Sequence, residues 1–216
     1  MTITALIADD HRIVRDGLRA LLQGENEFEV VAEAENGWDT VEAVKKFAPQ
    51  VVIMDINMPG LNGVDATRRI QSLGLPTRVL SLSSHGSQEF VKAMLKAGAA
   101  GYLLKECASS ELFTAIRTVV AGKVYVSPAV AGNLVKDYIS HLDGTRENAP
   151  ELTGREREVL QLLTEGQSTN AIAERLSLSV KTVESHRLRI MNKLDIRTIA
   201  GLTKYAIRSG ITSLED

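Results

Sequence analysis

The first 121 residues alternate between short apolar runs, typical of buried strands, and amphipathic segments, typical of helices. Parallel strands need a long crossover between them, usually a helix, so repeated strand–helix–strand units predict a parallel sheet covered by helices. We therefore expect a doubly wound α/β domain in the first half of the chain. The first expected strands and helices alternate at 2–8, 12–23, 28–34, 37–47 and 50–54.

Several of these apolar runs end in residues suited to phosphate or metal chemistry. The residues in question are Asp9 with Asp10, Asp55, Ser83 and Lys105. The carboxyl ends of parallel strands share one edge of a sheet, where open α/β folds bind their ligands. Each residue alone is an ordinary polar residue at a strand end. Together they predict a Mg2+-assisted phosphoryl-transfer site.

Each residue of this set has an expected task. Asp55 is the candidate nucleophile, because a carboxylate at a strand end can accept a phosphoryl group as an acyl phosphate. Mg2+ prefers oxygen ligands, so we expect it to be held by Asp9, Asp10 and Asp55, with the backbone carbonyl of Asn57 as a further ligand. Lys105 and Ser83 are expected to contact phosphoryl oxygens.

The motifs "LIADDH" (6–11), "VVIMDINMPGLNG" (51–63) and "GYLLK" (101–105), with Ser83, resemble the receiver domain of bacterial two-component response regulators over residues 1–122. The resemblance implies a flavodoxin-like, five-stranded parallel sheet of order 2-1-3-4-5. It implies a sensor histidine kinase as partner and Asp55 as phospho-acceptor. It also makes Ser83 the switch hydroxyl, Tyr102 the switch aromatic and Lys105 the phosphate-contacting lysine. Kinase specificity is expected in the first helix, near Arg15, Leu18 and Leu22.

Residues 123–150 are expected to form a linker that includes one helix, 127–142, with Ser127 as N-cap and Pro128 at its first position. Residues 151–216 carry no strand pattern and predict a small all-α domain. Thr153 and Glu156 have the spacing of a capping box. The expected helices are 153–165, 168–176, 179–194 and 198–208, a spacing that suits a helix-turn-helix.

The third of these helices is expected to read DNA. Helical periodicity places Val180, Val183, Ile190 and Leu194 on an inward face, with Arg187 nearer that side and Glu156 or Glu158 as its candidate partner. Basic residues on the outward face would neutralise phosphates, and polar or apolar ones would meet base edges. The expected DNA contacts are Lys181, Thr182, Glu184, Ser185, Leu188, Arg189 and Lys193.

Residues 152–211, beginning "LTGREREVLQLLTEGQSTNAIAERLSLSVKTVESHRLRIMNKL", resemble the DNA-binding domain of LuxR-type regulators. With the receiver, the whole chain resembles the NarL/FixJ class of response regulators. That class implies double-stranded DNA as partner and an active homodimer, often formed through the last helix. The possible dimer contacts there are Leu202, Tyr205 and Ala206.

Composition sets limits on the class of protein. A chain of 216 residues with 44% hydrophobic residues is no disordered chain, and its net charge of −2 neither predicts nor excludes a nucleic-acid partner. No apolar run approaches the roughly 20 residues that span a bilayer. The start "MTITALIADD" lacks the pattern of a secretory signal. We expect a cytoplasmic protein without a membrane partner.

Two other functions compete with a phosphorylation-controlled transcription regulator. A hydrolase or phosphotransferase would use the same aspartyl-phosphate chemistry, but "DIN" (55–57) lacks a second carboxylate two residues after Asp55. A DNA-binding protein with a vestigial pocket would not be expected to keep every acidic and basic group of the site. We therefore expect a regulator that is not an enzyme, except that it catalyses its own phosphorylation and dephosphorylation.

Overall fold

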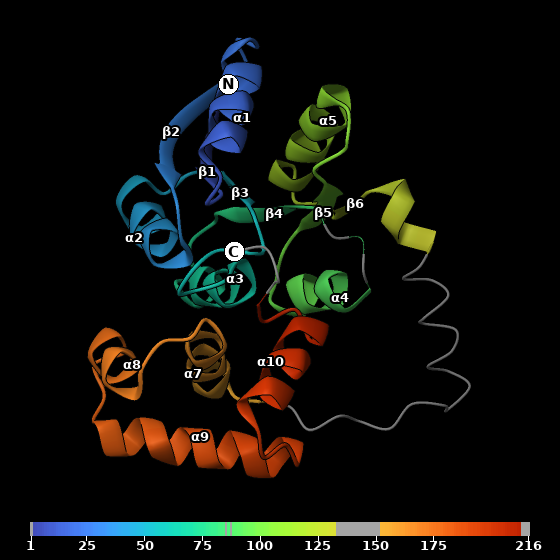
Figure 1. Cartoon of the computed structure of the whole chain (residues 1–216). Coiled ribbons are helices and arrows are strands. Elements are labelled where there is room, and N and C mark those ends of the chain that lie inside the picture. The colour runs from blue at the N-terminus through green and yellow to red at the C-terminus, as the bar shows by residue number, and fades with distance from the viewer. Residues whose placement is uncertain (1, 85, 87, 133–151, 213–216) are drawn as a thin grey trace. The chain divides into compact units, whose positions relative to one another are not determined.

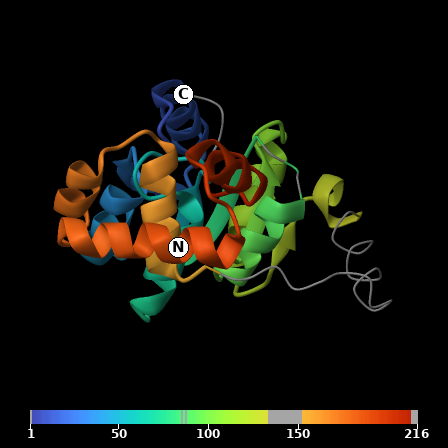
Figure 2. The ribbon, with the colours of Figure 1, turned by 60° about the horizontal axis from the view of Figure 1, so that its bottom comes forward.

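The computed structural model describes residues 2–84, 86, 88–132 and 152–212 (Figure 1). The chain divides into two compact units, Met1–Gly144 and Thr145–Asp216. Figure 2 gives a second view of the elements of each unit. Within the described residues, none of the helices combines the length and the apolar character that a membrane crossing requires.

The first unit is a parallel sheet whose strands follow the order β2-β1-β3-β4-β5-β6. The predicted α/β class is confirmed, and the first five strands have the expected order. The strands are β1 (Ile3–Ala8), β2 (Phe28–Ala34), β3 (Val51–Met54), β4 (Arg78–Ser83), β5 (Gly101–Leu104) and β6 (Tyr125–Val126). The helices are α1 (Arg12–Gln23), α2 (Gly37–Phe47), α3 (Gly63–Ser72), α4 (Gln88–Lys96) and α5 (Ser109–Val120).

Both faces of this sheet are covered, which explains why its strands are continuous apolar runs and not alternating ones. Successive strand residues point to opposite faces. Leu6 and Val52 belong to a core cluster that contains residues of α2, α3 and α4. Ile7 and Ile53 belong to a second cluster, with residues of α1 and α5. The two clusters hold the sheet rigidly from both sides, so its carboxyl edge is a well-supported place for a site.

The sixth strand extends the five-stranded sheet that the resemblance implied. Tyr125 pairs with Gly101 and Val126 with Tyr102, and the Ser127 amide donates to the Tyr102 carbonyl at 3.0 Å. Two residues are too few to show any periodicity, so no sequence pattern could predict this strand. Residues 128–132 are helical, as expected from Pro128; the rest of the predicted helix 127–142 and of the linker 123–150 lies outside the described residues.

The second unit contains four helices and no strand within its described residues. A hydroxyl side chain caps the start of every one of them by accepting a hydrogen bond from a backbone amide, and the predicted capping box of Thr153 and Glu156 is present. The predicted helices are confirmed to within one residue at each end. They are α7 (Gly154–Thr164), α8 (Thr169–Arg175), α9 (Val180–Leu194) and α10 (Ile199–Arg208).

The inward face of α9 was predicted correctly at its centre but not at its start. Val183 and Ile190 are fully buried, whereas Val180 is 41% exposed. A helical side chain leans over the turn that precedes it, and the first residue of a helix has no such turn. The side chain of Val180 therefore points past the end of α9 into solvent.

Candidate functional site

Backbone hydrogen bonds between neighbouring strands continue for one residue past the strand ends, and they place the candidate site residues. The Asp55 amide donates to the carbonyl of Ala8 at 2.8 Å, and the Lys105 amide donates to the carbonyl of Ser83 at 2.9 Å. The Asp9 amide donates to the carbonyl of Ala34 at 3.1 Å. The sheet itself thus brings these residues to one edge, as the sequence predicted.

Lys105 lies between two buried carboxylates. Its Nζ is 2.7 Å from Oδ2 of Asp9 and 3.2 Å from Oδ2 of Asp55. Burial alone would lower the pKa of Lys105, but the charges of Asp55 and Asp9 outweigh burial and raise it, so the ammonium form persists. This cation therefore lies beside Oδ2 of Asp55.

The contact with Lys105 does not fully offset the cost of burying the negative charge of Asp55. Burial, above all, raises its pKa to about 7; the charge of Asp9 adds to the rise, and Lys105 opposes it. A carboxyl that is half protonated near neutral pH is a weak nucleophile. The pocket would therefore gain from a bound cation.

The residues present suit such a cation. Oxygen or nitrogen atoms of Asp9, Asp10, His11 and Asp55 all lie within 4.8 Å of one another. The three carboxylates match the oxygen ligands that Mg2+ prefers. Asn57, whose backbone carbonyl was the other predicted ligand, is half-buried just beyond the acceptor.

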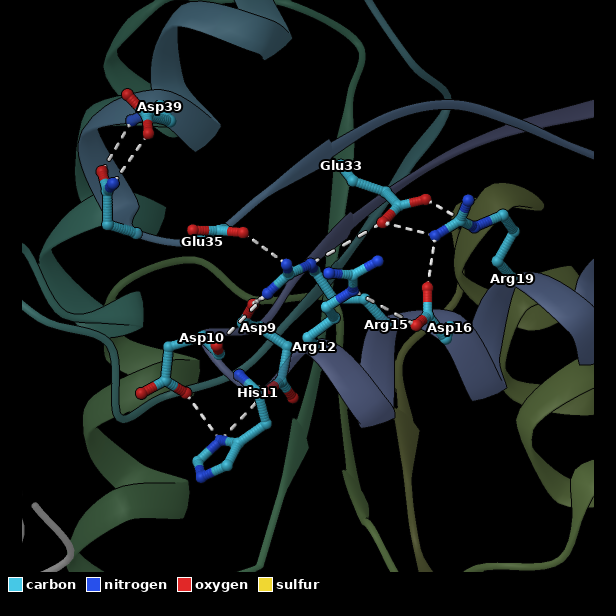
Figure 3. A network of polar contacts seen from close by, with 11 residues as sticks. Asp9, Asp10, His11, Arg12, Arg15, Asp16, Arg19, Glu33, Glu35 and Asp39 are labelled. Atoms are coloured by element: carbon cyan, nitrogen blue, oxygen red, sulfur yellow. Dashed lines mark hydrogen bonds and ion pairs between the residues drawn. The ribbon is translucent and has the colours of Figure 1, made fainter.

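His11 was missed as part of this cluster. Its Nδ1 lies 2.7 Å from Oδ1 of Asp10 and 3.3 Å from Oδ1 of Asp9, and its backbone amide donates to Oδ1 of Asp9 at 2.9 Å (Figure 3). The only signal in the sequence was its position directly after the acidic pair. His11 acts here by orienting both carboxylates.

The loop that follows Asp55 is fixed by close backbone contact at the start of α3. A Cβ atom on Gly63 would lie 2.0 Å from the backbone oxygen of Asp55, so only glycine fits there. The Gly63 amide donates to the carbonyl of Ile56 at 2.8 Å, and Asn62 caps the helix. The sequence "LNG" (61–63) thus sets the path of the chain beside the acceptor.

Ser83 and Tyr102 form the other wall of the site. Tyr102 is fully buried and Ser83 is 1% exposed, so Tyr102 is not the half-buried residue that an ordinary strand position would give. Burial, above all, raises the pKa of Tyr102 to about 12; a hydrogen bond with Ser83 opposes the rise, and the charge of Asp55 adds to it. The hydroxyl groups of Ser83 and Tyr102 are thereby linked within range of the charge of Asp55.

Kinase specificity was expected near three residues of α1 that the structure buries. Arg15, Leu18 and Leu22 are 5%, 7% and 0% exposed. They form the inner face of the helix, which packs against the sheet. A partner protein cannot reach these three side chains directly, and kinase specificity near them on α1 stays a prediction.

On α9, most of the predicted DNA-contacting side chains face solvent. Lys181, Glu184, Ser185 and Arg189 are exposed, and the apolar Leu188 is 58% exposed. A single exposed leucine is ordinary on a protein surface, so the observation that matters is that these residues share one face of α9. The structure therefore brings these residues together on one helix face.

Two of the predicted DNA contacts have partners within the second unit. Nζ of Lys193 lies 2.7 Å from Oε2 of Glu156, and the hydroxyl of Thr182 shares a 2.7 Å hydrogen bond with that of Ser179. Glu156 was expected to be a candidate partner of Arg187; Lys193 holds it instead. Lys193 and Thr182 thus have structural tasks.

The predicted dimer contacts on α10 are mostly inaccessible. Leu202 and Ala206 are fully buried, while Tyr205 is half-buried. Both residues are buried within the second unit, in which α10 packs against α7, so neither is exposed for contact with a second copy. Periodicity identified the apolar face of α10 but could not tell which surface covers it.

Two known protein families match the chain, one in each of its two units. Residues 5–117 match the response regulator receiver domain, and residues 150–206 match the bacterial regulatory proteins of the luxR family. The chain is a two-component response regulator with a LuxR-type DNA-binding domain. Its receiver carries the acidic pocket, and its DNA-binding domain carries α9.

Relatives of this response regulator share its whole length. It is 39% identical to the transcriptional regulatory protein DegU of Brevibacillus brevis, over 96% of this chain and 94% of that protein. It is 37% identical to the response regulator UvrY of Escherichia coli, over 99% and 97% of the two chains. The first of these relatives is named as a transcriptional regulatory protein.

Solved structures of similar proteins include a LuxR-family two-component response regulator from Aurantimonas, with a TM-score of 0.62 and 32% identity, over 64% of this chain and 99% of that one. RcsB of Salmonella enterica, solved bound to a promoter in the presence of the phosphomimetic BeF3-, has a TM-score of 0.62 and 27% identity. That match covers 98% of this chain and 100% of RcsB. The predicted fold class and family are thus confirmed.

Proposed function

We propose that this response regulator is switched by Mg2+-dependent phosphorylation of Asp55 by a sensor histidine kinase. The phosphorylated form would dimerise and bind a specific site on double-stranded DNA, and so control transcription in the cytoplasm. The observation that carries the proposal is the position of Asp55: a buried carboxylate at the sheet edge, 3.2 Å from Nζ of Lys105 and beside Asp9.

The chemistry assigns each group a step. One carboxylate oxygen of Asp55 forms a bond to the phosphorus of a phosphohistidine while the P–N bond breaks, and the electron pair leaves with the imidazole. Hydrolysis later adds water to the phosphorus and returns the carboxylate and inorganic phosphate. Nζ of Lys105 is placed to pair with a phosphoryl oxygen during both steps.

The metal site is proposed at the side chains of Asp9, Asp10 and Asp55 and the backbone carbonyl of Asn57. Mg2+, when bound there, supplies positive charge that lessens repulsion between the carboxylates and an incoming phosphoryl group. Its support is the cluster of donor atoms within 4.8 Å and the raised pKa of Asp55. The phosphoryl group passes to the protein's own Asp55 and from there to water, so the chain is proposed to act on itself.

The switch is proposed to run through Ser83 and Tyr102. A phosphoryl group on Asp55 would offer new hydrogen-bond acceptors, and the Ser83 hydroxyl, which now bonds Tyr102, would exchange that partner for one of them. That exchange would alter the packing of Tyr102, which lies in the main core cluster of the receiver. A local change of charge would thereby change the surface of the domain.

The output is proposed to be carried by the outward face of α9. Lys181 and Arg189 would neutralise phosphates, and Glu184, Ser185 and Leu188 would meet base edges in the major groove. The proposed limits are 1–122 for the receiver, 123–150 for the linker and 151–216 for the DNA-binding domain. A homodimer through the accessible side of α10, near Tyr205, would match a two-fold DNA site.

The test compares four conditions at one salt concentration. Binding to genomic DNA fragments and the oligomeric state would be measured for the wild type and Asp55→Asn, each with and without acetyl phosphate and Mg2+. Tighter DNA binding or dimerisation of the wild type alone, on addition of the donor, is the expected result. Equal binding in all four conditions would remove phosphorylation as the control. No binding in any of them would reject the transcriptional role.

A further inference from the structure

The guanidinium of Arg15 lies behind the acidic pair. Its Nη1 donates to the backbone oxygen of Asp9 at 2.8 Å and to that of Asp10 at 3.2 Å (Figure 3). The side chain is only 7% exposed. Because both contacts are to the main chain, Arg15 fixes the course of the β1–α1 turn and leaves the two carboxylates free to bind something else.

The other side of the guanidinium is held by carboxylates at the end of β2. Nη2 donates to Oε1 of Glu35 at 2.5 Å, and Nε lies 3.6 Å from Oε2 of Glu33. A buried cation needs such partners, because an unpaired one would be strongly destabilising. Arg15 therefore joins α1, the β1–α1 turn and the end of β2 in a single network, which Figure 3 shows.

The turn that Arg15 holds needs an anchor. Asp9, Asp10 and Asp55 carry like charges within a space of a few ångströms, and Lys105 contacts only Asp9 and Asp55 among them. Asp10 is the most exposed of the three carboxylates and sits where the chain leaves the sheet. Repulsion would favour moving the turn outward, which would separate Asp10 from Asp55.

We propose that Arg15 is a positioning residue for the Mg2+ site: it holds the main chain of Asp9 and Asp10 so that their carboxylates converge with Asp55. This inference rests on the proposed function, since it concerns the metal site named there. Arg15 does not touch the ion. Contacts that orient metal ligands from behind typically change metal affinity by about 10-fold to 100-fold.

Arg19 provides a matched control. It lies one turn further along α1 and shares the partner Glu33, with Nε 2.7 Å from Oε1 of that residue. Its Nη2 donates to Oε2 of Glu33 at 3.1 Å and to Oδ1 of Asp16 at 2.7 Å, and so its hydrogen bonds are made away from the acidic pair. Loss of either arginine removes a cation from the same network, but only loss of Arg15 releases the β1–α1 turn.

Removal of Arg15 should leave the fold intact. Glu35 is 70% exposed and can be hydrated, and Glu33 keeps Arg19 as its partner. Arg15→Met retains the length and apolar stem of the side chain. Arg15→Lys is the second variant, in case the first does not fold: its single ammonium cannot reach both backbone oxygens and Glu35 with the geometry of a guanidinium fork.

The experiment measures Mg2+ binding to the full chain by isothermal titration calorimetry, and thermal unfolding in EDTA. Arg15→Met is expected to bind Mg2+ about 10-fold more weakly, Arg15→Lys to lose less, and Arg19→Met to stay within about twofold of the wild type. Phosphorylation by acetyl phosphate should need correspondingly more Mg2+ in Arg15→Met, with the maximal rate restored at saturating Mg2+.

Two outcomes would overturn the inference in different ways. A folded Arg15→Met or Arg15→Lys protein with the Mg2+ affinity of the wild type would show that the arginine does not position the ligands. A wild type that binds no Mg2+ would reject the metal site itself, and with it any role of Arg15 there. Equal loss of Mg2+ affinity in Arg15→Met and Arg19→Met would also reject the specific role, because it would trace the effect to the shared charge network.

Discussion

Glu156 and Lys193 join the beginning of α7 to the end of α9, with 2.7 Å between Oε2 and Nζ. Burial alone would raise the pKa of Glu156, but hydrogen bonds from Lys193 and Thr153 outweigh it and leave the pKa below its usual value. The same Glu156 caps α7 by accepting from the backbone amide of Thr153 at 2.9 Å. One carboxylate therefore fixes both the start of α7 and the end of α9.

Lys193→Met is expected to destabilise the DNA-binding domain, because it leaves the buried carboxylate of Glu156 without its cation. The free energy of unfolding should fall by about 1–2 kcal/mol, the cost of a half-exposed charge-assisted hydrogen bond. Urea unfolding of the full chain, followed by circular dichroism, measures it. The stabilisation should also fade as pH drops below about 4.5, since protonation of Glu156 ends the pairing. Unchanged stability at neutral pH would contradict a structural role for this pair.

Lys181→Met, unlike Lys193→Met, is expected to weaken DNA binding without lowering stability. Lys181 is exposed near the start of α9, so its removal should leave stability unchanged within about 0.5 kcal/mol. DNA affinity should fall for all sequences alike, and the slope of log affinity against log salt should become shallower by about one. Fluorescence anisotropy over a series of salt concentrations tests this. A salt slope equal to that of the wild type would remove Lys181 from the DNA contacts.

The raised pKa of Asp55 predicts a pH-dependent stability of the receiver in EDTA. The carboxyl titrates near 4 when unfolded and near 7 when folded, so the folded state holds its proton more tightly. The free energy of unfolding should therefore decline as pH rises from about 4 to about 7, by on the order of a few kcal/mol. Asp55→Asn cannot titrate and should lose this decline. The free energy of unfolding of both proteins would be measured by urea titration at each pH. The same dependence on pH in both would refute the raised pKa of Asp55.

Gly63→Ala is expected to disrupt the acceptor loop. Its new Cβ would lie 2.0 Å from the backbone oxygen of Asp55, and backbone must move to relieve that contact. We expect a loss of more than about 3 kcal/mol in receiver stability, among the larger single-residue effects. Gly17→Ala is the control, because nothing lies within 4 Å of its Cβ in α1 and alanine favours helix. Thermal unfolding of both variants measures the contrast; equal melting temperatures would show that the loop is not tight.

The sequence predicted most of the fold because each of its main signals is local. Apolar runs and helix caps such as Thr153 are read from neighbouring residues, and the predicted helices of the second unit agree with the structure to within one residue at each end. The gathering of Asp9, Asp55 and Lys105 followed from one rule about the edges of parallel sheets. These features need no knowledge of which elements pack together.

The errors concern which surface covers a side chain. Periodicity marks Leu202 and Ala206 as one apolar face, but a face that packs within the domain and a face that packs in a dimer have the same pattern. Arg15 was expected only in the part of α1 that determines kinase specificity, yet its side chain is buried because main-chain oxygens of the β1–α1 turn and carboxylates at the end of β2 pair with it. Long-range partners of this kind leave no signal in a single sequence.

The short strand β6 determines where the chain leaves the receiver. Its pairing places Ser127 on the carbonyl of Tyr102 at 3.0 Å, and Val130, three residues on, is 1% exposed within the core cluster that also contains Tyr102. The segment that leads to the next domain thus begins as part of the sheet, held to Tyr102 by backbone hydrogen bonds. A displacement of the Tyr102 backbone would therefore also displace residues 126–130, with which this segment begins.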